Sequence, residues 1–197
     1  MRIYLVTDER LLLGKDLYRT VEAAVKGGVS MVQLREKESS TREFVERAIR
    51  LKEVLTPYGV PLIINDRVDV ALAANADGVH VGQSDMPYEM VKRLLPEGKI
   101  IGLSVESPEQ VLEANNYDLD YVAASPVFST TTKTNTIVEW GLDGLRWIRS
   151  VSRHPLVAIG GIHSNNVASI CKAGADSVAV ISAIVSADDP ERAAREL

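Results

Sequence analysis

The chain has few cysteines and histidines, the residues that form disulfides or bind metals through sulfur or nitrogen, and it has no apolar run long enough to cross a membrane. Its 197 residues include one cysteine, Cys171, and three histidines. One cysteine forms no internal disulfide, and its place in the helix-like run VASICKAGAD predicts a small buried apolar side chain. We find no signal peptide and no 18-residue apolar run, and therefore expect a cytoplasmic protein.

Basic residues are also fewer than acidic ones. Lysine and arginine number 22 against 27 acidic residues, which gives a net charge of −5 and a pI near 5.3. This balance argues against nucleic acid or a membrane as the partner, so an anion site would have to be local. The length and the ordinary soluble composition predict a single domain spanning residues 1–197.

The sequence lacks a G-x-G-x-x-G motif after its first apolar run, which weakens the case for a doubly wound open sheet. Instead, short apolar runs alternate with amphipathic ones eight times, and 41–58 is the clearest amphipathic helix. Nearly continuous apolar strands predict a parallel sheet covered by helices, here an α/β fold of the (β/α)8 TIM-barrel type. The expected strands are 2–7, 30–34, 61–64, 78–81, 99–103, 119–124, 156–159 and 177–180.

Polar and small residues gather at the carboxyl ends of these expected strands, the end where barrel enzymes place their chemistry. In chain order they are Gln33, Arg35 and Lys37, Asn65 and Asp66, Gly82 to Asp85, Ser104, Ser125, Gly160 and Gly161, and Ser182. Two simpler interpretations stay open. Asn65 and Asp66 could cap the next helix, and Arg35 and Lys37 could pair with Glu36 and Glu38 in a solvated turn.

The stretch 125–133, SPVFSTTTK, follows the sixth strand and places four hydroxyls beside Lys133. Hydroxyls and backbone N–H groups near an ammonium suit a phosphate or diphosphate, although a solvated loop is the alternative. Asp66 and Asp85 follow adjacent strands and form a plausible Mg²⁺ pair, since magnesium prefers oxygen ligands and often shares substrate phosphates. A second phosphate site is expected at Gly161 and Ser182.

Two anion sites at one barrel mouth indicate two substrates, one of which carries a diphosphate leaving group. Group transfer with loss of that diphosphate is then the natural reaction class. No histidine or cysteine nucleophile stands out, which argues against covalent catalysis. His80 lies in an apolar strand and is interpreted as a packed core residue.

Several motifs together resemble one known family, thiamine-phosphate synthase. They are VQLREK at 32–37, IINDRVDVALAANADGVHVGQSDMP at 63–87, GLSV at 102–105, T-x-T-K at 130–133, VAIGGI at 157–162 and AGADSVAVISAI at 173–184. The resemblance implies condensation of an aminopyrimidine-methyl diphosphate with a thiazole phosphate, which gives thiamine phosphate and pyrophosphate with Mg²⁺ as cofactor. It also implies a dissociative mechanism, in which the diphosphate leaves before the thiazole nitrogen attacks.

The resemblance also implies roles for individual residues. Asp66 and Asp85 would bind Mg²⁺, and Gln33 would contact the pyrimidine. The diphosphate would be held by Arg35, Lys37, Asn65, Ser104 and Lys133, and Arg35, Lys37, Ser104 and Lys133 are the expected catalytic groups. The thiazole phosphate would be seated by Thr130, Thr132, Gly161, Ile181 and Ser182.

Three positions depart from the family's pattern: Ser125, Ser129 and Glu106 replace a frequent glycine, proline and histidine. They leave every charged diphosphate contact in place, but could reshape the loop 125–135, which we interpret as a candidate lid. The alternatives are a thiazole tautomerase on the same barrel and a non-catalytic barrel that binds a phosphate ligand. The sequence leaves the oligomeric state open, with a homo-oligomer as one option.

Overall fold

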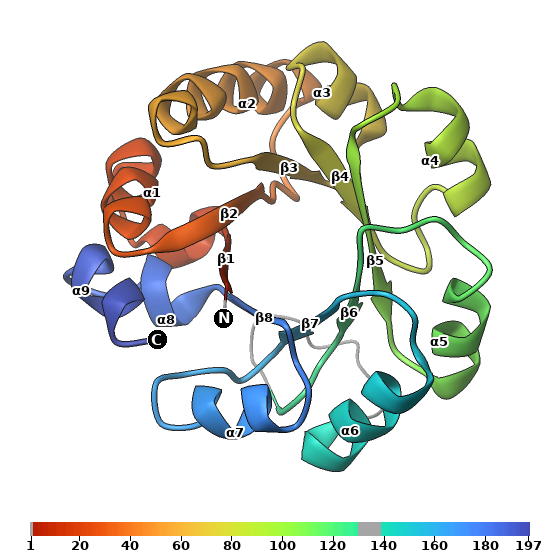
Figure 1. Cartoon of the computed structure of the whole chain (residues 1–197). Helices are drawn as coiled ribbons and strands as arrows, with labels where there is room; N and C mark the ends of the chain where they lie inside the picture. Colours follow the sequence, from red (N-terminus) through yellow and green to blue (C-terminus); the bar gives the residue numbers. More distant parts are fainter. Residues whose placement is uncertain (1, 130–138) are drawn as a thin grey trace.

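The computed structural model describes residues 2–129 and 139–197, and in it eight parallel strands close into a barrel (Figure 1). Each strand pairs with the next along the chain, and the last pairs with the first. The predicted (β/α)8 fold is confirmed. The strands are β1 (Arg2–Val6), β2 (Val29–Leu34), β3 (Leu62–Asn65), β4 (Gly78–Val81), β5 (Ile100–Val105), β6 (Tyr121–Ala124), β7 (Leu156–Ile159) and β8 (Ser177–Val180).

Helices surround the barrel and connect successive strands (Figure 1). They are α1 (Leu17–Lys26), α2 (Thr41–Leu55), α3 (Val68–Ala73), α4 (Tyr88–Leu94), α5 (Pro108–Ala114), α6 (Gly141–Val151), α7 (Val167–Lys172), α8 (Ser182–Val185) and α9 (Pro190–Arg195). Two 3₁₀ turns, η1 (Glu9–Leu12) and η2 (Thr56–Tyr58), complete the described elements.

The boundaries differ from the sequence prediction at three informative places. The helix predicted over 41–58 ends at Leu55 and continues as the 3₁₀ turn η2, in which Thr56 before Pro57 keeps helical angles (φ −54°, ψ −45°) and Gly59 ends the turn in the left-handed conformation. Strand β5 runs to Val105, and β3 ends on Asn65. Asn65 and Ser104 therefore lie within strands, which fix the direction of their side chains. The sequence placed both residues just beyond the strand ends.

Alternation along the strands divides the apolar residues into two cores. Outward-facing residues such as Leu5 and Leu34 pack against the helices in the larger core. Inward-facing residues fill the barrel in a smaller one, which comprises Tyr4, Val6, Ile63, Tyr121, Ala123, Val157 and Ala179. Gly102 in β5 makes room for this inner core, since a Cβ there would lie 2.1 Å from Cζ of Tyr121.

One device recurs at the amino-terminal end of the barrel. An aspartate stands directly before β4, β6 and β8, and its Oδ2 accepts the backbone N–H of the first or second residue of the preceding strand. The pairs are Asp77 with Leu62 (2.8 Å), Asp120 with Ile101 (2.8 Å) and Asp176 with Leu156 (2.7 Å). These bonds satisfy donors that the parallel ladder leaves open, so they stabilise the end of the barrel opposite the cavity described below.

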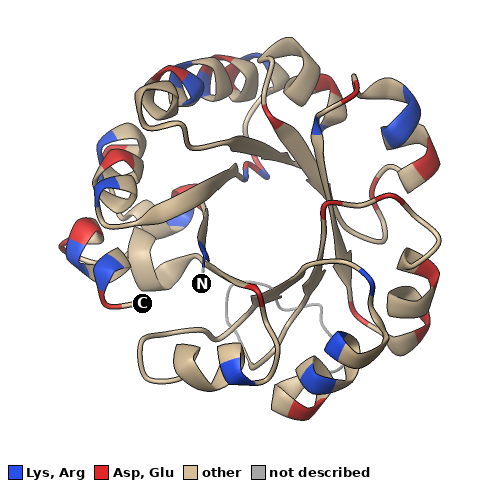
Figure 2. Ribbon diagram, in the orientation of Figure 1, with Lys and Arg blue, Asp and Glu red and all other residues tan. Residues whose placement is uncertain are grey.

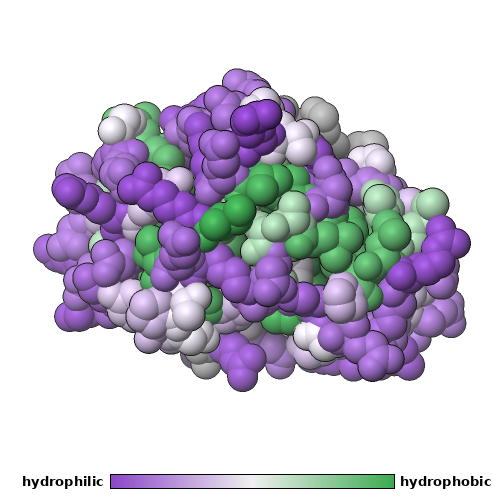
Figure 3. Space-filling model, turned by 90° about the horizontal axis from the view of Figure 1, so that it is seen from above, coloured by the Kyte–Doolittle hydropathy of each residue, from purple (hydrophilic) through white to green (hydrophobic). Residues whose placement is uncertain are grey.

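Charged residues belong mainly to the outer helices and to the loops (Figure 2). The face seen from above carries an apolar area within a polar surround (Figure 3), and α2, α3 and α4 on that side expose Ile49, Leu72, Met90 and Leu94. Among the described helices none is long and apolar enough to cross a membrane. Cys171 on α7 is only partly buried, which corrects the prediction of a buried residue, because its helix packs on the barrel along Val167 and Ile170 instead.

Candidate active site

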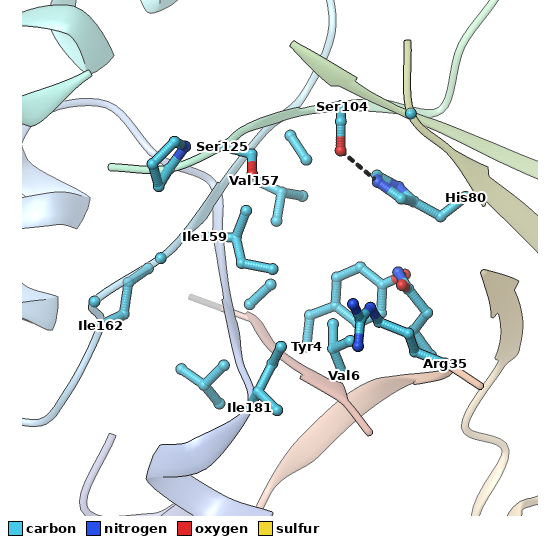
Figure 4. Close-up of a pocket in the computed structure, with 18 of the residues that line it drawn as sticks. Tyr4, Val6, Arg35, His80, Ser104, Ser125, Val157, Ile159, Ile162 and Ile181 are labelled. Carbon is cyan, nitrogen blue, oxygen red and sulfur yellow. Dashed lines mark hydrogen bonds between the residues drawn. The ribbon is translucent and has the colours of Figure 1, made fainter. Parts of the chain in front are cut away.

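A cavity of about 1040 Å³ opens at the carboxyl ends of the strands. Its lining has two chemically different sides (Figure 4). The polar side comes from β2 to β5 and presents Gln33, Asn65, His80 and Ser104. The apolar side comes from β6 to β8 and the residue after β8, and presents Ala123, Val157, Ile159, Ala179 and Ile181. A pocket of this size, with polar groups gathered on one side and apolar ones on the other, suits a small molecule that carries both kinds of group.

Arg35 projects from the loop after β2 and is held by a residue of the β1 loop. Its Nη1 donates to Oδ2 of Asp8 at 2.8 Å, and the Asp8 side chain is only 4% exposed. The backbone N–H of Arg35 also donates to the hydroxyl of Thr7 at 3.1 Å. Arg35 is therefore fixed from the outer side, while the residue lines the cavity.

Lys37 lies on the same loop and pairs with the predicted metal ligand Asp66, with 2.6 Å between Nζ and Oδ2. The simpler interpretation, in which Arg35 and Lys37 pair with Glu36 and Glu38, is therefore wrong for the contacts that the structure gives them. Glu36 instead accepts from Arg47 of α2 at 2.9 Å. Arg35 and Lys37 both line the cavity, and Glu36 does not compete for them because it pairs with Arg47.

Arg47 joins three segments behind the cavity. It donates to Glu36 and, through both terminal nitrogens, to Glu9 of η1 at 2.8 and 3.0 Å. The pKa of the Glu9 carboxyl is lowered, mainly by its hydrogen bond with Arg47. Burial has a smaller effect in the opposite direction. A guanidinium suits this bridge because its fork can reach two carboxylates at once. The β1 and β2 loops are thereby tied to α2.

Asp66 and Asp85 follow β3 and β4, and the structure brings them close together. Burial, and then the neighbouring Asp66, raise the pKa of the Asp85 carboxyl. Oδ2 of Asp85 also accepts the backbone N–H of Gly82 at 2.7 Å. Two neighbouring carboxylates offer oxygen donors, which fit a hard cation such as Mg²⁺. Among the described residues no cluster of three or more acidic, histidine or cysteine ligands is found.

Asp66 has an unusual backbone, with φ at 62°, a left-handed conformation that aspartate tolerates better than most residues. Its N–H donates to the carbonyl of His80 at 2.8 Å, which fixes this turn against β4. The alternative that Asn65 and Asp66 cap the next helix is wrong: α3 begins after Arg67 and has no side-chain cap. Backbone strain of this kind is often kept at functional sites.

Gly160 and Gly161, after β7, approach the segment after β6. The N–H groups of Val127 and Phe128 donate to the carbonyls of Ile159 and Gly160 at 2.8 and 3.2 Å. Gly161 has φ of 64°, and a Cβ there would lie 2.8 Å from Cβ of Phe128. Glycine is therefore required twice over at this point, by conformation and by close packing. Gly160, Gly161, Ile181 and Ser182 all line the cavity.

Three residues inside the barrel are missed as site residues by the sequence reasoning: Tyr4, Tyr121 and His80. The Tyr4 and Tyr121 hydroxyls lie 2.9 Å apart, and His80 Nδ1 lies 3.0 Å from Tyr121 OH. His80 is buried as predicted, but it faces the cavity and its Nε2 lies 2.9 Å from Ser104 Oγ (Figure 4). The alternation in GVHV at 78–81 points His80 inward, and this was the available signal.

Thr130, Thr132 and Lys133, which the sequence also assigns to the site, lie outside the described residues, as does most of the candidate lid 125–135. The segment on either side of them does reach the cavity, since Ser125, Phe128, Ser129 and Glu139 line it. The Ser129 hydroxyl donates to the Glu139 carboxylate, which joins the two flanks. All three residues that depart from the family's pattern, Ser125, Ser129 and Glu106, line the cavity.

Together the fold and the cavity define a (β/α)8 barrel with cations and hydroxyls gathered at the carboxyl ends of its strands, the arrangement of a phosphate-binding barrel. The family model described as thiamine monophosphate synthase matches residues 3–184. The chain belongs to the thiamine monophosphate synthase family.

Full-length relatives agree with this assignment. A thiamine-phosphate synthase from Albidiferax ferrireducens is 52% identical over 197 residues, which are 100% of this chain and 90% of the relative. One from Vibrio campbellii is 50% identical over 196 residues, with 100% and 96% covered. The solved thiamine phosphate pyrophosphorylase from Pyrococcus furiosus has a TM-score of 0.90 at 41% identity, covering 100% of this chain and 93% of that one.

Proposed function

We propose that this chain condenses 4-amino-2-methyl-5-hydroxymethylpyrimidine diphosphate with 4-methyl-5-(2-hydroxyethyl)thiazole phosphate to give thiamine phosphate and pyrophosphate. The observation that supports it most directly is the convergence of Arg35, Lys37, Asp66 and Asp85 on one cavity whose opposite side is apolar. A diphosphate needs the first side and the uncharged carbon framework of the substrates suits the second.

The polar side would bind the pyrimidine diphosphate. Arg35, Lys37 and Lys133 would contact the diphosphate with Asn65 and Ser104 as hydrogen-bonding groups, while Gln33 would contact the pyrimidine. The thiazole phosphate would lie toward Gly161, Ile181 and Ser182, with Thr130 and Thr132. Glycine at positions 160 and 161 lets the backbone approach a phosphate there, because it carries no side chain of its own.

The chemistry asked of this chain is positioning and charge stabilisation. As the bond to the diphosphate breaks, negative charge grows on the leaving group, and fixed cations on the polar side lower the energy of that state. Arg35 is held by Asp8, so little reorganisation is needed when the charge develops. The cavity needs no protein nucleophile if the diphosphate leaves before the thiazole nitrogen attacks.

Asp66 and Asp85 would hold Mg²⁺, which supplies further positive charge to the leaving diphosphate. Lys37 pairs with Asp66, and would be free to turn toward the diphosphate once a cation sits between the carboxylates. We expect Asp85→Asn to shift the Mg²⁺ concentration for half-maximal activity upward by roughly tenfold or more. Asp188→Asn, an exposed aspartate between α8 and α9, is the matched control and should leave the Mg²⁺ curve unchanged.

The decisive experiment measures pyrophosphate release from the pyrimidine diphosphate, with and without the thiazole phosphate and Mg²⁺. We expect release to require both substrates and the metal, and to collapse in Asp66→Ala but not in Asp188→Ala. Binding of the thiazole phosphate without pyrophosphate release under any condition would contradict the proposal. It would favour the tautomerase or the non-catalytic barrel instead.

The tautomerase has no use for a diphosphate site, and this chain keeps Arg35, Lys37, Asp66 and Asp85, so we rank it second. We also propose that the protein works in the cytoplasm on small-molecule substrates. Sedimentation of the purified protein would decide between a monomer and a homo-oligomer.

A further inference from the structure

Five side chains from five strands form one continuous run of hydrogen bonds inside the barrel, which we call the buried chain. Gln33 Nε2 donates to Tyr4 OH at 2.7 Å, and the Tyr4 and Tyr121 hydroxyls lie 2.9 Å apart. His80 Nδ1 lies 3.0 Å from Tyr121 OH and its Nε2 lies 2.9 Å from Ser104 Oγ. All five are less than a tenth exposed. Its two ends, Gln33 and Ser104, are the residues expected to contact the pyrimidine and the diphosphate.

The run crosses the barrel, because Tyr4 on β1 and Tyr121 on β6 are not on neighbouring strands. Their rings meet edge to face at 5.8 Å, and the His80 ring stacks on Tyr121 at 5.6 Å. Gly102 leaves the space that the Tyr121 ring fills. The positions of the hydroxyls are therefore set by packing and not only by their hydrogen bonds.

Each tyrosine has one proton to donate, since burial raises the pKa of both hydroxyls and keeps them protonated. A neutral imidazole has one donor and one acceptor nitrogen. With a neutral imidazole these four hydrogen bonds can all form in two ways, with every donor pointing from Gln33 toward Ser104, or every donor pointing back. A mixed arrangement leaves a buried proton or lone pair unmatched, which is costly.

The Gln33 amide decides between the two directions. Its Nε2 faces Tyr4, so Tyr4 accepts from Gln33 and must donate to Tyr121. Along this direction Tyr121 would donate to His80 Nδ1, and His80, with its proton on Nε2, would donate to Ser104 Oγ. In this direction Gln33 keeps its carbonyl oxygen for a ligand, and Ser104 keeps its hydroxyl proton for one.

These two ends match the two halves of one substrate. An amino group on a pyrimidine donates and needs an acceptor such as Gln33 Oε1, whereas diphosphate oxygens accept and need a donor such as the Ser104 hydroxyl. In the reverse direction Gln33 would offer only N–H groups and Ser104 only lone pairs. Gln33 would then lack the acceptor that the amino group needs, and Ser104 would lack the donor that the diphosphate needs, because one reversal changes the hydrogen bonds of all five residues.

We propose that the buried chain couples recognition of the substrate's amino group at Gln33 to recognition of its diphosphate at Ser104, and that Tyr4, Tyr121 and His80 are positioning residues for both. The proposal rests on the proposed function for the identity of the substrate. Binding at either end selects the direction in which the other end is competent, so each half of the substrate strengthens the binding of the other.

A histidine-ring ¹⁵N–¹H correlation spectrum of the ligand-free protein tests the direction without any turnover. The signal is assigned to His80 by its loss in His80→Asn. A proton on Nε2 with a bare Nδ1 supports the proposal. A proton on Nδ1, whether alone or in the doubly protonated ring, overturns it.

Calorimetry with substrate fragments tests the coupling. Pyrophosphate with Mg²⁺ is titrated into the protein with and without saturating 4-amino-5-hydroxymethyl-2-methylpyrimidine, which carries no phosphate. We expect the pyrimidine to lower the Kd of pyrophosphate about fivefold or more in the wild type. In Tyr121→Phe, which keeps the ring over Gly102, and in Tyr4→Phe, the ratio should fall close to one.

Tyr117→Phe is the matched control, because its hydroxyl bonds Glu113 on the surface, and it should keep the wild-type ratio. No coupling in the wild type, or full coupling in both Tyr121→Phe and Tyr4→Phe, would overturn the proposal. Coupling that is present without pyrophosphate release would contradict the proposed reaction and leave the buried chain's role supported. Pyrophosphate release without coupling would support the proposed reaction and overturn the proposed role of the buried chain.

Discussion

Arg35 Nη1 lies 2.8 Å from Oδ2 of Asp8, a carboxylate that is almost completely buried behind the cavity wall. Asp8 also accepts the backbone N–H of Arg10 at 3.1 Å, so one side chain begins η1 and anchors a cation of the candidate site. A charge placed in this way is oriented before any ligand arrives.

Asp8→Asn keeps an oxygen for the Arg10 N–H but loses the charge that holds Arg35. We expect the KM for the pyrimidine diphosphate to rise about tenfold, because a displaced guanidinium binds and stabilises the leaving group less well. The KM for the thiazole phosphate should stay unchanged. Steady-state kinetics with each substrate varied in turn checks this, with Asp188→Asn as the control. An unchanged KM for the diphosphate would show that Arg35 needs no anchor.

Gly161→Ala should damage the second phosphate site. Its Cβ would meet Cβ of Phe128 at 2.8 Å and the Ser129 carbonyl oxygen at 2.9 Å, in a left-handed backbone. We expect a loss of about 2 kcal/mol in unfolding free energy and a higher KM for the thiazole phosphate.

Gly14→Ala separates strain from contact, because Gly14 also has a left-handed φ, 83°, but a Cβ there meets nothing within 4 Å. It should cost only about 1 kcal/mol and leave both KM values alone. Equal effects of the two substitutions on the thiazole phosphate would remove the case for a contact at Gly161.

Asp176→Ala should lower stability and spare activity. It removes the acceptor of the fully buried Leu156 N–H and the partner of Arg149, which lies 3.0 Å away. An unmatched buried donor costs about 1–3 kcal/mol. Urea unfolding should show that loss, and Asp176→Asn, which keeps an acceptor oxygen, should recover much of it. A fall in kcat of the folded variant at 25 °C would contradict the assignment of this end of the barrel to stability alone.

Cys171 should react slowly with iodoacetamide. Partial burial raises the pKa of its thiol, so less thiolate is present at a given pH, and the thiolate is the reacting form. At pH 8 we expect alkylation about tenfold slower than in the urea-unfolded chain, with the difference shrinking as the pH rises through the folded pKa. Mass spectrometry of timed samples gives both rates. Equal rates in the folded and unfolded chain would show that the thiol is fully open to solvent.

Much of the fold could be predicted because β4, β7 and β8 read directly as short apolar runs between helical ones, and they occupy the predicted residues. The meeting of Arg35, Lys37, Asp66 and Asp85 also followed from the sequence. In a parallel barrel the carboxyl ends of all strands share one face, so residues after neighbouring strands must approach.

The contacts within that face could not be predicted in the same way. Asp8 meets Arg35 across two loops, and Tyr4 meets Tyr121 across the barrel, so both depend on register and on the space that Gly102 leaves. The sequence offered Asp66 as a helix cap because aspartate is common there, yet its left-handed backbone turns it toward Lys37 instead. Local preference was overridden by the tertiary contacts of the turn.

The division of the cavity into a polar and an apolar side also bears on fidelity. A dissociative reaction produces a cation that either water or the thiazole can capture, and the two captures compete within each catalytic cycle. The apolar side, from Ala123 to Ile181, gives water few hydrogen-bonding partners where the thiazole would approach. The apolar residues of β6 to β8 would then favour capture of the cation by the thiazole over capture by water. The effect is measured by the ratio of thiamine phosphate formed to pyrimidine alcohol formed by hydrolysis.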